Sequence, residues 1–71
     1  MQQKSPSAMP AGALVYQERL RLGLTLQQLA RAVGTSTSTL SKLEQGVHYP
    51  RRALAVRLAN LLGVPVERLY A

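Results

Sequence analysis

The chain has 71 residues, with nine lysines and arginines against three acidic residues, and its formal net charge is +6. A chain this short forms one domain with a small core, and the absence of cysteine excludes a disulfide framework and a cysteine-ligated zinc site. With a single histidine we expect no metal site and no cofactor. The positive net charge is typical of a protein that binds polyanions, although a net charge also serves solubility alone.

Residues 1–12 combine prolines, serines and a glycine without hydrophobic periodicity, so we predict a disordered tail there. The start, MQQKSPSAMP, lacks the apolar core of a secretory signal. No apolar run approaches the roughly 20 residues of a membrane helix. We therefore expect a cytoplasmic, nucleoid-associated protein of bacterial or phage type, with no membrane partner.

The first helix is predicted over residues 13–22. Gly23 follows this segment and is typical of the position just after a helix end. The apolar surface of the helix is expected from Leu14, Val15, Leu20 and Leu22.

A second helix is predicted over residues 26–33, and its start is well marked. Thr25 is the expected N-cap, and Gln28, three residues later, completes a capping box. Leu24 and Leu29 flank the cap as the apolar pair of a hydrophobic staple. Apolar residues then recur at helical spacing, which predicts one buried face.

Gly34 follows and fits a turn that needs a positive φ or no side chain. Ser36 is the expected N-cap of a third helix, over residues 37–45, in which Leu40 and Leu43 are three residues apart. So short a linker favours two helices that cross steeply, the helix-turn-helix arrangement. Hydroxyl residues crowd the third helix although they are poor helix formers, so its outer face is either tolerant surface or shaped for contact.

Residues 47–50 are a predicted loop, and a fourth helix is expected over residues 51–62, with Pro50 fitting its first turn. Pro65 opens a short fifth helix. No strand pattern is present, so the predicted fold is all-α, a compact bundle of four to five helices over residues 13–71. The fourth helix is expected to bury Leu54, Leu58, Leu61 and Leu62.

The stretch 26–44 resembles the helix-turn-helix of the lambda-repressor/Cro-like (Xre-type) DNA-binding family. The resemblance extends over about residues 14–70. It implies a lambda-repressor-like domain that regulates transcription by binding double-stranded DNA sequence-specifically, more often as a repressor. The resemblance also implies that helix 37–45 is the recognition helix and lies in the major groove. The matching residues are Leu29, Ala30, Val33, Gly34, Leu40, Leu43, Glu44, Gln45 and Gly46.

The resemblance also implies which residues face DNA. Among the base-contact candidates, only Lys42 can make a two-donor contact to guanine, and the hydroxyl side chains suit phosphate equally well. The base-contact candidates are Ser36, Thr37, Ser38, Ser41 and Lys42.

Phosphate contacts are expected from helix starts and basic residues. Leu26 stands where many relatives carry a phosphate-gripping glutamine, and Gln27 is a partial substitute. Arg19 and Glu44 correspond to a pair that joins two helices in relatives, so we expect an ion pair, with an arginine edge left for phosphate. The candidates are Arg19, Gln27, Gln28, Gln45, Arg51 and Arg52.

The C-terminal apolar residues have two interpretations, a cap on the core or a two-fold dimer interface. We favour a homodimer on a palindromic operator. The alternative function is a helix-turn-helix reused as a protein-interaction module, antitoxin-like or inhibitor-like. No catalytic residues are predicted, and the chain is not expected to be an enzyme. The dimer candidates are Val64, Val66, Leu69 and Tyr70.

Overall fold

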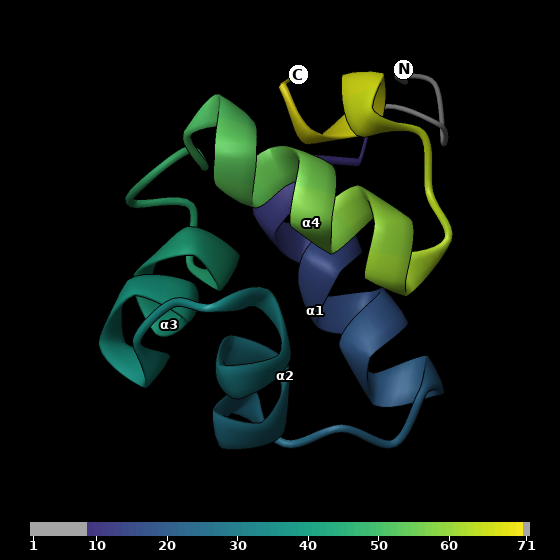
Figure 1. The fold of residues 1–71 in the computed structure, drawn as a ribbon. Coiled ribbons are helices and arrows are strands. Elements are labelled where there is room, and N and C mark those ends of the chain that lie inside the picture. Colours follow the sequence, from purple (N-terminus) through teal and green to yellow (C-terminus); the bar gives the residue numbers. More distant parts are fainter. Residues whose placement is uncertain (1–8, 71) are drawn as a thin grey trace, which may run out of the picture.

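The computed structural model describes residues 9–70. It contains α1 (Ala11–Arg21), α2 (Leu26–Val33), α3 (Thr37–Glu44), α4 (Arg52–Leu62) and a 3-10 helix, η1 (Val66–Leu69). No strand occurs within these residues, and the predicted all-α fold is confirmed. α4 crosses in front of α1, while α2 and α3 lie next to each other at the lower left of the view (Figure 1).

The core draws on all five elements. α1 packs against α3, α4 and η1, and α2 packs against α3 and α4. The helix-turn-helix, α2 and α3, is therefore mounted on a scaffold of α1 and α4. The largest fully buried side chains are Val15, Leu29, Val33, Leu40, Leu43, Leu58, Leu62 and Leu69.

The capping box predicted for α2 is present. The Gln28 backbone N–H donates to Thr25 Oγ1 over 3.0 Å, and the Thr25 backbone N–H donates to Gln28 Oε1 over 2.9 Å. Two amide groups at the helix start are thereby satisfied, and the bounds of α2 are those predicted. α3 starts where predicted but ends at Glu44, one residue early, with Gln45 as its C-cap.

Gly34 makes the turn between α2 and α3. Its φ is +75°, in the left-handed region that side-chain-bearing residues rarely adopt. The Thr35 N–H then donates to the Ala30 carbonyl over 2.9 Å and closes the end of α2. This local geometry turns the chain sharply enough for α3 to begin only three residues after α2 ends.

The prediction for α1 was wrong at both ends. The helix begins at Ala11, directly after Pro10, because the apolar face of Leu14 and Val15 extends back to Ala11, which is 1% exposed. Leu20 and Leu22, predicted to supply apolar surface to the core, are 52% and 41% exposed. Residues 1–8 of the predicted tail lie outside the described residues.

The start of α4 also differs from the prediction. Arg51 is the N-cap, and the buried Pro50 precedes it, outside the first turn. Leu61 is 38% exposed, because the buried face follows positions 55, 58, 59 and 62. No helix in the described part of the chain is long and apolar enough to cross a membrane.

Candidate nucleic-acid interface

Three side chains stand on the exposed face of α3. Thr37 and Ser38 occupy its first turn, and Lys42 follows one turn later. Within residues 9–70, no hydrogen bond or ion pair engages these three side chains. Their polar atoms are therefore available to an external partner. We call Thr37, Ser38 and Lys42 the outer face.

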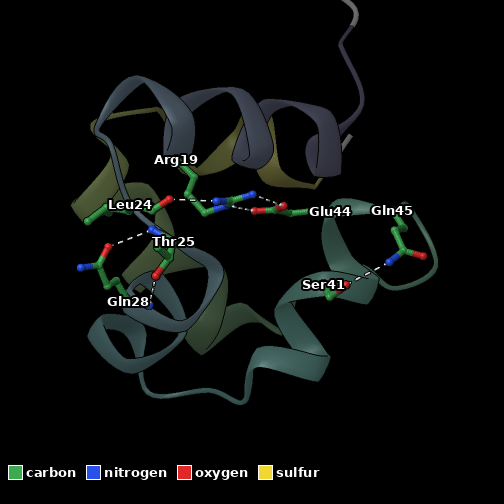
Figure 2. A network of polar contacts seen from close by, with 7 residues as sticks. All are labelled: Arg19, Leu24, Thr25, Gln28, Ser41, Glu44 and Gln45. Atoms are coloured by element: carbon green, nitrogen blue, oxygen red, sulfur yellow. Dashed lines mark hydrogen bonds and ion pairs between the residues drawn. The ribbon is translucent and has the colours of Figure 1, made fainter.

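The other two base-contact candidates are engaged inside the protein. Ser36 Oγ accepts from the Thr39 backbone N–H over 3.0 Å and donates to Thr39 Oγ1 over 2.9 Å. Ser41 is half-buried, and its Oγ accepts from Gln45 Nε2 over 2.9 Å (Figure 2). Ser36 is thus the predicted N-cap, and its hydroxyl group supports the helix start.

Arg19 joins α1 to the end of α3. Its Nε donates to Glu44 Oε2 over 2.8 Å, and its Nη2 donates to Glu44 Oε1 over 3.1 Å (Figure 2). Nη1 donates to the Leu24 carbonyl over 2.8 Å. The predicted ion pair is confirmed, and a side chain only 9% exposed leaves little edge for phosphate.

The ion pair has consequences for charge and for helix placement. The hydrogen bond to Glu44 is the main cause that raises the pKa of Arg19 above its ordinary value, against an opposing effect of burial. The Tyr16 ring lies 5.4 Å from the guanidinium carbon and covers one side of it. The planar guanidinium group of Arg19 therefore ties the end of α3 to α1 and to the loop between α1 and α2.

Gly12 provides a second point of contact between α1 and α3, which the sequence prediction missed by assigning it to the tail. A Cβ atom there would lie 2.3 Å from the Leu43 carbonyl oxygen and 2.9 Å from that of Glu44. The available signal was spacing, because Gly12 and Arg19 are seven residues apart and share a helix face.

The phosphate candidates other than Arg19 lie at three separate places. Gln27 is exposed in the first turn of α2, beside Gln28, whose side-chain oxygen is occupied by the capping box. Arg51 and Arg52 are exposed at the start of α4. Gln45 is held at the end of α3 by its bond to Ser41.

A groove of about 520 Å³ runs between α3 and the start of α4. Thr39 and Leu43 line it from α3, and Leu54 and Arg57 line it from α4. Arg57 Nη1 reaches across and donates to the Val33 carbonyl over 3.4 Å. Sequence reasoning gave no indication of this groove, because it depends on how far α4 stands from α3.

Two acidic side chains are neutralised by ion pairs within the protein. Glu44 pairs with Arg19, and Glu18 pairs with Arg21 over 2.6 Å, so two of the three acids neutralise arginines of α1. Among residues 9–70, Lys42 and the arginines at the start of α4 take part in no ion pair. Nor do the described residues contain a group of three or more side chains suited to hold a metal ion.

The four dimer candidates differ in exposure. Leu69 is 0% exposed, so it belongs to the core and has no exposed surface for a dimer partner. Val64 and Val66 are half-buried against the core. Tyr70 is 47% exposed.

Comparisons with known proteins were made for sequence and for fold. A family model described as Helix-turn-helix matches residues 15–69. An HTH-type transcriptional regulator of Methanothermobacter thermautotrophicus is 42% identical over 50 residues, which cover 70% of this chain and 72% of that protein. The HTH-type transcriptional regulator RghRB of Bacillus subtilis is 40% identical over 63 residues, covering 87% of this chain and 45% of that protein.

Two solved structures share the fold. SinR, a master regulator for biofilm formation crystallised in complex with DNA, matches with a TM-score of 0.75 and 27% identity, covering 86% of this chain and 98% of that chain. The clp gene regulator ClgR from Corynebacterium glutamicum matches with a TM-score of 0.76 and 28% identity, covering 96% and 72%.

Proposed function

The chain belongs to the helix-turn-helix family of transcriptional regulators, and on that premise we propose that it binds double-stranded DNA sequence-specifically and represses transcription. The observation that carries the proposal is the outer face of α3. It presents two hydroxyl groups and one ammonium group without internal partners among the described residues. That face belongs to a chain of net charge +6.

In the proposed complex, α3 enters the major groove, where each base pair shows a distinct pattern of donors and acceptors. Lys42 donates to guanine O6 and N7, and the Thr37 methyl group contacts thymine. Gln27 and the amide groups at the start of α2 that the capping box leaves free bind phosphates of one DNA strand. Arg51 and Arg52, at the start of α4, bind phosphates on the other side of α3.

Repression in this scheme is occlusion of a promoter by the bound protein, acting in the cytoplasm at the nucleoid. We further propose a homodimer through Tyr70 with Val64 and Val66, because a two-fold pair of such domains doubles the contact area on a palindromic site. SinR supports DNA as the ligand, since its matching chain was crystallised with DNA.

Selection from a random-sequence duplex library with the purified protein tests the proposal. We expect enrichment of a palindrome whose half-sites are centred about 10 base pairs apart. Binding that is sensitive to salt but enriches no sequence would contradict sequence-specific recognition. It would instead support the protein-interaction module, which the polar and cationic outer face of α3 does not favour.

A further inference from the structure

The approach of α1 to the end of α3 at Gly12 is closer than any side chain allows. A Cβ atom at this position would lie 2.3 Å from the Leu43 carbonyl oxygen, and the nearest groups belong to backbone, which cannot rotate away. Ordinary contact between such atoms is about 3.5 Å, so a methyl group would displace the end of α3 by about 1 Å.

Gly12 and the ion pair act at two points on one helix. Arg19 lies seven residues after Gly12, which is about 10 Å along the axis of α1. Both residues contact the last turn of α3, Gly12 through backbone carbonyls and Arg19 through the Glu44 carboxylate. Two points on a rigid helix fix both the distance and the direction of the turn that they hold.

We propose that Gly12 is a positioning residue for DNA recognition, because it sets how closely the end of α3 approaches α1. This inference rests on the proposed function. Lys42 immediately precedes Leu43, so it moves with the carbonyl that Gly12 meets. A shift of about 1 Å exceeds the roughly 0.5 Å tolerance of a binding group. A displaced α3 therefore loses base contacts while its cationic surface, and with it binding to any duplex, is retained.

Gly12→Ala in the full chain tests the inference, with Gly23→Ala as the matched control. Gly23 ends α1 at φ +72°, and a Cβ atom there would meet nothing within 4 Å. Alanine at position 23 thus strains the same helix without touching α3. Affinities for the selected operator and for a random duplex are measured by fluorescence anisotropy at fixed salt, at a temperature where circular dichroism shows both variants folded.

For Gly12→Ala we expect operator affinity to fall at least about tenfold and random-duplex affinity to fall less than about twofold. For Gly23→Ala we expect the ratio of operator affinity to random-duplex affinity to stay at its wild-type value. An unchanged ratio in Gly12→Ala, or an equal loss of ratio in both variants, would overturn the inference. If Gly12→Ala does not fold in buffer, all three proteins are compared in trimethylamine N-oxide, which favours the folded state.

Residual dipolar couplings of the α3 amides relative to α1 separate the inference from the proposed function. We expect Gly12→Ala to reorient α3 and Gly23→Ala to leave it in place. If the wild-type protein prefers no duplex, the proposed function fails, and the couplings still decide whether Gly12 sets the orientation of α3. An unchanged orientation would overturn the positioning role even if the operator ratio fell.

Discussion

In the proposed complex with DNA, Lys42 is the side chain that would read bases most directly. It is the one cation on the outer face of α3, whose other members, Thr37 and Ser38, carry short hydroxyl groups. Hydroxyl groups bond equally to bases and phosphates, so they discriminate weakly. If α3 enters the major groove, the loss of one ammonium group removes most of the bidentate reading that this helix can make.

We expect Lys42→Ala to weaken operator binding by about 1–3 kcal/mol and binding to random duplex by much less. Arg31→Ala is the control, because it removes one exposed positive charge from α2, beside Gln27 and Gln28, and not from the outer face of α3. Both duplexes are titrated at the same salt concentration. An equal loss on both would show that Lys42 only neutralises phosphate.

Glu44→Gln is expected to lower the free energy of unfolding by about 2–3 kcal/mol. The substitution leaves the Arg19 charge, on a side chain 9% exposed, with only the Leu24 carbonyl as an undisturbed partner. Urea denaturation measures the change. Glu18→Gln removes the acid of an exposed pair on α1 and is expected to cost less than about 1 kcal/mol. Equal effects of the two changes would refute the special cost of the buried pair.

The bounds of individual helices were predictable where the signals are local. Thr25 and Gln28 satisfy each other within one turn, so the start of α2 could be read from sequence. The start of α1 could not, because Ala11 and Gly12 become helical and buried through contact with α3 and the core. From sequence alone, a glycine such as Gly12 indicates a flexible segment, and only its contact with the end of α3 shows why glycine is needed there.

We expect Thr25→Ala to destabilise the protein by about 1 kcal/mol, because the Gln28 amide group at the start of α2 loses its partner, the Thr25 hydroxyl group. Ser38→Ala is the control within the first turn of α3, where the described residues offer its side chain no hydrogen bond. Its effect is expected to stay within about 0.5 kcal/mol. Comparable losses in thermal or urea unfolding would mean that the capping box contributes nothing beyond helix propensity.

At the scale of the whole molecule, both ion pairs of the described residues are made by arginines of α1. They neutralise Glu18 of α1 and Glu44 of α3, whereas Lys42 of α3 and the arginines at the start of α4 have no acidic partner among residues 9–70. Composition gives the net charge of +6 but not which side chains are paired. The groove beside α3 and the burial of Leu69 likewise depend on packing that no local pattern encodes.

Tyr70→Asp is expected to give a monomer that binds operator half-sites without cooperativity, because a charge replaces the exposed ring at the proposed interface. Sedimentation velocity of wild type and variant measures the mass. Tyr49→Asp places the same charge on a tyrosine that is 67% exposed in the loop before α4, and it should leave the mass unchanged. A wild-type protein that sediments as a monomer, with or without operator, would refute the homodimer.

The outer face of α3 has a consequence for evolution. Leu40, Leu43 and Glu44 attach α3 to the protein, whereas Thr37, Ser38 and Lys42 contribute no internal polar contact within the described residues. Mutations at the outer positions therefore change the free energy of unfolding little. Under the proposed function, a duplicated copy of this chain would be able to change its operator by successive single substitutions at these positions, with every intermediate still folded.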